Sequence, residues 1–329
     1  MRSLNRNSCL NLLKCIACFG VVFIHVTFPG KLGDIVKYAS AFAVPIFILI
    51  AGYYSFGCSE SKIKNRLIKI IKILLFGYVW FLLVQLLVNM KNNQLSSWII
   101  SNFNWKTPIW YIVFCTISWA VPLWYLIAMA ETYFFWKIIV KHNLQDQACK
   151  WTWVLLLAGA LLTTLVDSFN LNWSYKINFV CRALPWFMLG YLIRGKYEDA
   201  IKRLSNQKWM LLAVIGWIIT LSAVLLKTKV NYNYWGVLLT APSLFAIGIK
   251  NPNLKVSKAI EFIGDKLSLF IYIFHPLVSQ CILALVGKLE FCQKNVDIYK
   301  YIYIYIYIYS SNNNFDRNYY YSKYFLYCF

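Results

Sequence analysis

Residues 10–29 read LNLLKCIACFGVVFIHVTFP, an almost unbroken apolar stretch that holds one lysine and one histidine. About 20 residues of α-helix cover about 30 Å, which is the thickness of the hydrocarbon core of a bilayer. Backbone groups that face lipid must be hydrogen-bonded within their own segment, so this stretch predicts a membrane-spanning helix. No small-residue cleavage site follows it closely, and we therefore interpret it as a retained first helix and not as a signal peptide.

Similar apolar stretches recur along the 329 residues, of which 60% are apolar and 14% charged. Soluble domains carry about 25% charged residues, so the composition argues against a soluble protein. The stretches are too long for the strands of a barrel. We predict an all-α polytopic membrane bundle of nine to ten helices, near residues 10–29, 37–57, 70–90, 110–140, 151–167, 177–194, 209–226, 234–249 and 267–287, with a tenth after residue 298. The stretch 110–140 exceeds one helix and leaves room for a preceding re-entrant piece.

The net charge of +21, from 33 Lys and Arg against 12 Asp and Glu, fits this topology. Alternate connections between the predicted helices carry nineteen and seven basic residues, and the richer set includes the N-terminus. Cytoplasmic loops of membrane proteins are rich in Lys and Arg, so the N-terminus is predicted to be cytoplasmic. The basic residues are thereby explained by insertion into a lipid bilayer, and a nucleic-acid partner is not expected.

The ten cysteines are scattered, and we predict neither a disulfide framework nor a metal site. Cys15 and Cys18 form a C-x-x-C pattern, but they lie inside the first predicted helix. A redox pair would lack both water and a βαβ setting there. We therefore interpret these two cysteines as small side chains that suit a lipid environment.

Ionisable side chains within predicted spans are functional candidates, because burying them in a bilayer is costly. Lys14 and His25 are eleven residues apart, which corresponds to about three turns plus 20° and about 16 Å along one helix face. They can line a polar path, or Lys14 can reach the inner headgroups while His25 completes a hydrogen bond at the outer end. His275 stands before Pro276 in the ninth span, where proline frees a backbone carbonyl. This histidine can serve a substrate or simply bond to the broken backbone.

Three further charged features stand out. Arg182 lies in the outer half of the sixth span and requires a polar partner, for which Glu131 in the fourth is a candidate, unless the arginine reaches the outer headgroups. Residues 62–72, KIKNRLIKIIK, form the densest cationic stretch. As a helical continuation of the third span it would place Arg66 and Lys69 on the cytoplasmic surface, either for topology alone or as a cradle for phosphates.

Together these residues resemble the membrane acyltransferase type 3 family. The first helix of that family is marked by a basic residue, ten others and a histidine, as in Lys14 to His25. Further similar blocks follow in order along residues 8–285: residues 42–52 (FAVPIFILIAG), Arg66-x-x-Lys69, residues 123–128 (LWYLIA), residues 182–190 (RALPWFMLG), and Ile263-Gly264 with residues 268–276 (SLFIYIFHP).

The resemblance implies an enzyme that moves an acyl group, usually acetyl from acetyl-CoA, to a hydroxyl of a cell-surface or lipid-linked carbohydrate. It further implies a multi-pass protein of the bacterial plasma membrane, with acyl-CoA as co-substrate and no permanently bound cofactor. His25 is then expected to act as general base, and Lys14 or Arg182 to stabilise the thioester oxyanion. The remaining site residues are expected to bind substrate (His275, Trp124 and Glu131) and the CoA phosphates (Arg66 and Lys69).

The sequence departs from the family pattern at three positions. Lysine replaces the commoner arginine at Lys14 and at Lys69, and Asn11 occupies a position that is often acidic. Lysine keeps the charge but not the bidentate geometry of arginine, so donor affinity can differ. The alternative interpretation of the chain is a non-enzymatic bundle of the same fold that binds or transports a small solute, because intramembrane charges also mark transport paths.

We predict a membrane acyltransferase domain over residues 1–290 and an atypical Tyr/Ile/Asn-rich tail over residues 291–329. The tail contains the strict Tyr/Ile alternation YKYIYIYIYIY from residue 299, a period-2 pattern that suits a strand better than a spanning helix. A TA dinucleotide repeat would encode this alternation. We therefore interpret the tail as a frame-shifted remnant of a last helix.

Overall fold

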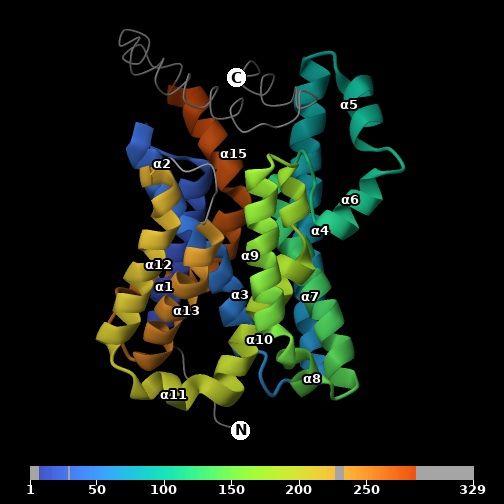
Figure 1. Ribbon diagram of the computed structural model, residues 1–329. Coiled ribbons are helices and arrows are strands. Elements are labelled where there is room, and N and C mark those ends of the chain that lie inside the picture. Colours follow the sequence, from blue (N-terminus) through green and yellow to red (C-terminus); the bar gives the residue numbers. More distant parts are fainter. Residues whose placement is uncertain (1–6, 29, 227–232, 287–329) are drawn as a thin grey trace.

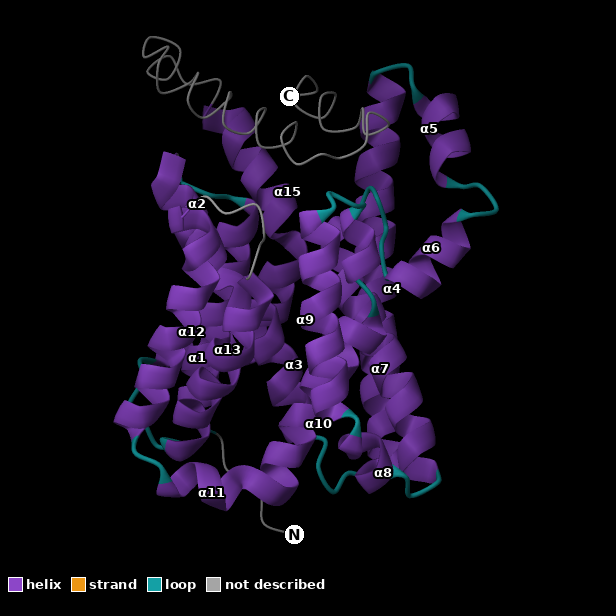
Figure 2. Cartoon of the chain, viewed as in Figure 1, coloured by secondary structure: helices purple, strands orange, loops and turns teal. Residues whose placement is uncertain are grey.

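The computed structural model describes residues 7–28, 30–226 and 233–286, and helices are the regular structure within them (Figures 1 and 2). The all-α prediction is thereby confirmed. The helices are α1 (Ser8–His25), α2 (Gly30–Ala39), α3 (Ala43–Tyr53), α4 (Glu60–Lys91), α5 (Leu95–Asn102), α6 (Thr107–Phe114), α7 (Trp124–Lys141), α8 (Gln145–Lys150), α9 (Thr152–Ser168), α10 (Leu184–Leu192), α11 (Glu198–Arg203), α12 (Asn206–Leu226), α13 (Asn233–Lys250), α14 (Lys258–Phe262) and α15 (Ser268–Val286).

Five segments of the described chain are long and apolar enough to cross a membrane: Ser8–His25, Gly30–Tyr53, Glu60–Lys91, Val121–Lys141 and Asn206–Leu226. The chain is thus a multi-pass membrane protein by the length and composition of its helices. Each of the nine predicted spans contains helical residues, but the number of crossings stays a prediction. The predicted tenth helix and the tail over residues 291–329 lie outside the described residues.

One predicted boundary is wrong, and the structure shows what the surplus length of another predicted span forms. The second span begins at Gly30 and not near residue 37, so that Lys31 and Lys37 lie in a helix and not in a connecting loop. The surplus length of the 110–140 stretch forms a separate short helix, α6, which ends at Cys115 in a left-handed conformation (φ 49°). A residue in this conformation ends a helix, and apolar character alone does not reveal it.

Helices α5 and α6 form an arm that stands beside the main bundle (Figure 1). Helix α6 buries none of its residues, although it is strongly apolar. With eight residues it extends about 12 Å, too short to cross the hydrocarbon core. The arm is therefore distinct from the spanning helices.

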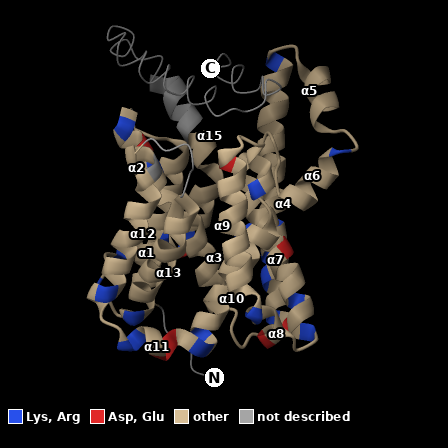
Figure 3. Cartoon of the chain, in the orientation of Figure 1, with Lys and Arg blue, Asp and Glu red and all other residues tan. Residues whose placement is uncertain are grey.

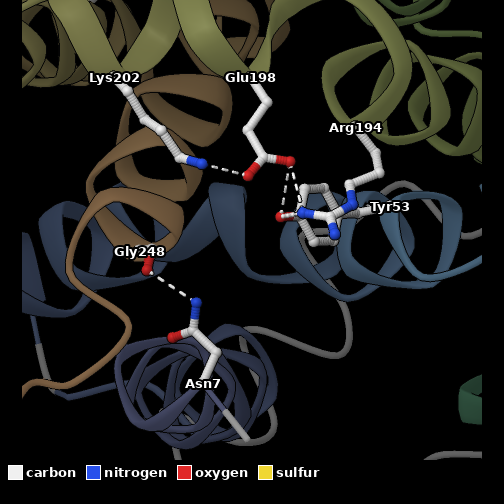
Figure 4. A network of polar contacts seen from close by, with 6 residues as sticks. All are labelled: Asn7, Tyr53, Arg194, Glu198, Lys202 and Gly248. Atoms are coloured by element: carbon white, nitrogen blue, oxygen red, sulfur yellow. Dashed lines mark hydrogen bonds and ion pairs between the residues drawn. The ribbon is translucent and has the colours of Figure 1, made fainter. Parts of the chain in front are cut away.

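The start of α1 is fixed to the end of α13. The Asn7 side chain caps α1 by accepting a hydrogen bond from Leu10 N, and it donates to the carbonyl of Gly248 at 3.2 Å (Figure 4). The hydroxyl of Ser8 also donates to Glu261. Such a cap satisfies one of the backbone donors that the first turn of a helix leaves unpaired.

The backbones of helices α3 and α10 approach each other closely where the two helices cross. A Cβ atom added to Gly52 would lie 1.9 Å from the carbonyl oxygen of Phe187, and one added to Gly190 would lie 2.1 Å from that of Leu49. Only glycine permits backbones to approach this closely, as at many helix contacts in membranes. The two glycines end the blocks 42–52 and 182–190 of the sequence, so these blocks pack against each other.

Lysine and arginine gather at the end of the bundle where α8 and α11 lie (Figure 3). We call this the cationic end. Helix α1 begins there and ends at His25 on the opposite side, which we call the histidine end. The two ends of α1 therefore face chemically different surroundings.

Candidate active site

His25 and His275 come together at the histidine end. His25 is the last residue of α1, and His275 lies in α15. Their ring centroids are 4.9 Å apart and the ring planes are inclined by 40°, so the two imidazoles are in contact. His275 is 4% exposed, whereas His25 is exposed. The pair thus presents one accessible imidazole with a buried one behind it.

The backbone beside Pro276 holds the buried imidazole. Proline has no N–H, so Pro276 cannot donate to the carbonyl of Tyr272, four residues earlier in α15. Nδ1 of His275 lies 2.8 Å from this carbonyl oxygen. The sequence suggested such a bond as the structural alternative for His275, and the structure contains it together with the contact to His25.

An aromatic wall continues from the histidine pair into the bundle. The Tyr272 ring lies 6.3 Å from His275 and 4.9 Å from Tyr125, between ring centroids, and Phe47 contacts both tyrosines. Trp124 packs its ring against Tyr125 at 6.4 Å and is half-buried. Tyr125 and Tyr272 are buried, and the substrate-binding role of Trp124 stays a prediction.

Charged groups from three elements surround the histidine end. Lys37 of α2 acts electrostatically on His25, and it interacts in turn with Asp34 and Lys176. Lys176, in the turn Trp173–Lys176, forms an ion pair with Asp167 of α9. Sequence reasoning missed this cluster because it assigned Lys37 and Lys176 to loops and counted them only for topology.

Arg182 joins this cluster but not through the partner that was predicted. Its Nε donates to the carbonyl of Lys176 at 3.0 Å, and its guanidinium lies 4.3 Å from the centroid of the Tyr234 ring. Among the described residues Arg182 forms no ion pair with Glu131, which instead accepts a hydrogen bond from Cys115 Sγ at 3.2 Å. A carbonyl and an aromatic face already stabilise the guanidinium, so it has no need of the carboxylate.

Lys14 lies on the same helix as His25, towards the cationic end. It is half-buried, and its Nζ donates to Asn11 Oδ1 at 3.2 Å. Asp265 and Lys266, in the π-helical turn Ile263–Leu267 directly before α15, are the charged groups that act on it. Lys14 and His25 therefore both face the helical segment formed by this turn and α15.

Arg66 and Lys69 lie one turn apart on α4, whose helix includes the predicted cationic stretch. Arg66 is half-buried, and its guanidinium donates to Ser55 Oγ at 2.7 Å and to the carbonyl of Tyr54 at 2.8 Å. Lys69 is exposed. Of these two residues, Lys69 presents an accessible charge, while Arg66 is oriented by the end of α3.

A second arginine converges on the same end of α3 (Figure 4). Arg194, in the π-helical turn Ile193–Tyr197, donates to the Tyr53 hydroxyl at 2.7 Å and to Glu198 at 2.5 Å, and Lys202 donates to the other oxygen of Glu198 at 2.5 Å. Burial opposes ionisation of Glu198, but the hydrogen bonds from Lys202 and Arg194 outweigh it and lower the pKa of this carboxyl. The carboxylate thus fixes two cations at the cationic end.

Sequence reasoning counted Arg194 only for topology, and it did not predict the π-helical turns. Three such turns, Phe179–Ala183, Ile193–Tyr197 and Ile263–Leu267, carry Arg182, Arg194 and the Asp265–Lys266 pair. Turns of this kind often occur at functional sites, because one extra residue redirects the side chains. No residue type in the sequence marks them, so this part of the site depends on the packing.

A comparison with protein families identifies the family of the chain. The profile of the acyltransferase 3 family, described as an acyltransferase domain, matches residues 7–311. No curated protein and no solved structure matches the chain. The matched region contains every residue of the site described above. The chain therefore belongs to the acyltransferase 3 family and is a membrane acyltransferase.

Proposed function

We propose that the protein transfers an acyl group, namely the acetyl group of cytoplasmic acetyl-CoA, to a hydroxyl of a cell-surface or lipid-linked carbohydrate. The observation that carries the proposal is that the two ends of α1 have different surroundings. At one end Lys14 lies among charged groups, and at the other His25 contacts His275. A reaction between a polyanionic donor and a hydroxyl acceptor requires these two kinds of surroundings.

The proposed orientation places the cationic end in the cytoplasm of a bacterium, with nine or ten helices crossing its plasma membrane. Lys and Arg concentrate at this end (Figure 3), as they do on the cytoplasmic side of membrane proteins. The donor then approaches from the cytoplasm and the acceptor from the outer side. Lys14 and His25 are about 16 Å apart along the helix, so the acyl group must reach into the bundle.

The donor would bind with its phosphates at the cationic end. Lys69 offers an accessible ammonium, and Arg66 is held by the end of α3 beside it. Charge-assisted hydrogen bonds to phosphate oxygens are among the strongest polar contacts in proteins. Lys14 and Arg182 are the candidates for stabilising negative charge on the thioester oxygen during transfer.

The acceptor hydroxyl would react beside His25. Its oxygen attacks the carbonyl carbon of the thioester while a ring nitrogen of His25 takes the hydroxyl proton, which is general base catalysis. The new C–O bond forms, the C–S bond breaks, and the thiolate of CoA leaves. The proton on His25 then returns to this thiolate, so that free CoA and the acylated carbohydrate are the products.

The proposal is tested with membranes that contain the protein. Membranes are supplied with acetyl-labelled acetyl-CoA, and the label on surface polysaccharide and lipid-linked glycan is measured. We expect label to appear on one of these fractions and to be lost in the His25→Ala variant at equal protein level. Label that does not depend on the protein, or uptake of a solute without acetyl transfer, would contradict the proposal. Analysis of the labelled fraction identifies acceptor and acyl group together.

A further inference from the structure

The hydrogen bond at Pro276 determines which nitrogen of His275 carries a proton. A carbonyl oxygen can only accept, so Nδ1 of His275 must be the donor in its 2.8 Å contact with Tyr272. A neutral imidazole has one N–H and one lone pair. His275 in its neutral form therefore presents Nε2 as an acceptor.

We propose that His275 is the positioning residue of His25, and this inference rests on the proposed function. In it, Nε2 of His275 accepts a hydrogen bond from a ring N–H of His25. The other nitrogen of His25 then carries the lone pair that takes the proton of the acceptor hydroxyl. The exposed imidazole of His25 is thus the base, and the buried imidazole of His275 fixes its tautomer and its ring orientation.

The geometry supports this arrangement in three ways. The rings are in contact at 4.9 Å, the buried ring is fixed by the backbone of α15, and the exposed ring is the one that a substrate can reach. The structure shows the contact between the two rings, and the hydrogen bond from His25 to Nε2 is the proposed step. When His25 becomes an imidazolium during the reaction, this bond would stabilise the positive charge. The same principle applies to histidines whose second nitrogen is bonded to a carboxylate or a carbonyl.

Pro276 has a specific part in this arrangement. A residue with an N–H at this position would bond to the carbonyl of Tyr272 in the ordinary helical manner. Because proline lacks this donor, the carbonyl is available to His275. The dipeptide His-Pro thereby encodes a defined tautomer within the continuous helix α15.

Two variants separate the positioning role from a merely structural one. His275→Asn places an amide near the site of Nδ1, where it can still donate to Tyr272, but it has no group at the place of Nε2. His275→Gln places its amide near the site of Nε2, where the oxygen can accept from His25. His142→Asn is the matched control, because His142 is exposed at the end of α7, at the cationic end.

We expect the maximal rate of acetyl transfer to fall about 10- to 100-fold in His275→Asn and less in His275→Gln, with an unchanged KM for acetyl-CoA. His142→Asn should match the wild type. Full activity in His275→Asn with loss in His275→Gln would overturn the proposal, because satisfying the Tyr272 carbonyl would then suffice. So would a raised KM at an unchanged maximal rate.

The pH profile is a further readout that a structural role would not move. The titratable groups that act on His25 are Lys37 from α2 and His275 from α15. His275→Asn removes the acceptor at Nε2 that stabilises the imidazolium of His25, so the acidic limb of the rate profile should shift to lower pH in this variant and remain closer to that of the wild type in His275→Gln. An identical profile in all three proteins would contradict the coupling.

Nuclear magnetic resonance of the ¹⁵N-histidine-labelled protein tests the tautomer without any activity. The chain has 3 histidines, so the His275→Asn and His142→Asn variants identify their signals. We expect a neutral His275 with the proton on Nδ1. A proton on Nε2, or on both nitrogens, would overturn the inference. This readout stands even if the membranes show no acetyl transfer, so failure of the inference and failure of the proposed function are distinguishable.

Discussion

The two ends of α1 differ in how they hold their polar groups. At the histidine end, His275 is buried and His25 rests against it, with an ion pair of Asp167 and Lys176 nearby. At the cationic end, Lys69 is exposed and Arg66 is only half-buried. A buried histidine that orients an accessible one suits a chemical step that depends on orientation, whereas exposed cations suit the binding of a polyanion. Changes at the two ends should therefore affect different kinetic constants.

The largest effect is expected for the base at the histidine end. His25→Ala should lower the maximal rate of acetyl transfer at least about 100-fold and leave the KM for acetyl-CoA unchanged, since it removes a group that acts in the transition state. Initial rates with labelled acetyl-CoA measure both constants. A raised KM with a normal maximal rate would contradict the proposed difference between the two ends.

A change at the cationic end should have the opposite signature. Lys69→Ala removes an exposed charge and should raise the KM for acetyl-CoA several-fold at an unchanged maximal rate and melting temperature. Arg66→Ala should raise the KM and also lower the melting temperature, because it breaks hydrogen bonds to Ser55 and Tyr54. Kinetics and thermal unfolding of the purified variants provide the test, and equal melting temperatures for both would contradict the structural role of Arg66.

The crossing of α3 and α10 fixes α3, whose end holds Arg66. Gly190→Ala would place a Cβ 2.1 Å from the carbonyl of Leu49, so the helices must separate, at a cost of about 1–3 kcal/mol. We expect a lower melting temperature and a higher KM for acetyl-CoA, because the end of α3 that orients Arg66 shifts with these helices. Gly57→Asn is a suitable control, since Gly57 has φ 65° and open space around it, and asparagine tolerates this conformation. Equal stability of the two variants would contradict the close crossing.

The smallest effect concerns the pH dependence of stability at the cationic end. The folded protein lowers the pKa of Glu198, so its ion pairs stabilise the fold above the pKa of the unfolded chain. This contribution is lost as the pH falls through the folded value. Each of its i,i+4 pairs contributes about 0.3–0.5 kcal/mol. Glu198→Gln should therefore flatten the acid side of a plot of melting temperature against pH, and an unaltered plot would show that the network adds no stability.

The sequence predicted the helical class and the main polar positions for a clear reason. Long apolar stretches can satisfy their backbone hydrogen bonds in a membrane only as helices, and charged residues inside them are rare enough to be conspicuous. Lys14, His25 and His275 were identified in this way, as was the proline beside His275. The helix boundaries at Gly30 and Cys115 were not predicted, since they depend on backbone conformation and not on apolarity.

The partners of the charged residues could not be predicted. Arg182 interacts with a carbonyl and with Tyr234 rather than with Glu131, and Arg194 forms its network through a π-helical turn. Any arginine in a span needs a polar partner, but several elements can offer one. The choice depends on how the helices are packed.

The sequence by itself determined that this chain forms helices in a membrane, which stretches form them, and which side chains must be functional candidates. It also placed Lys14 and His25 on one helix, because helical periodicity is a local property. The tertiary structure decided that His25 contacts His275 and that Lys37 acts on His25. These contacts join helices that are far apart in the chain, and side-chain packing between them, which has no local sequence signal, selects them.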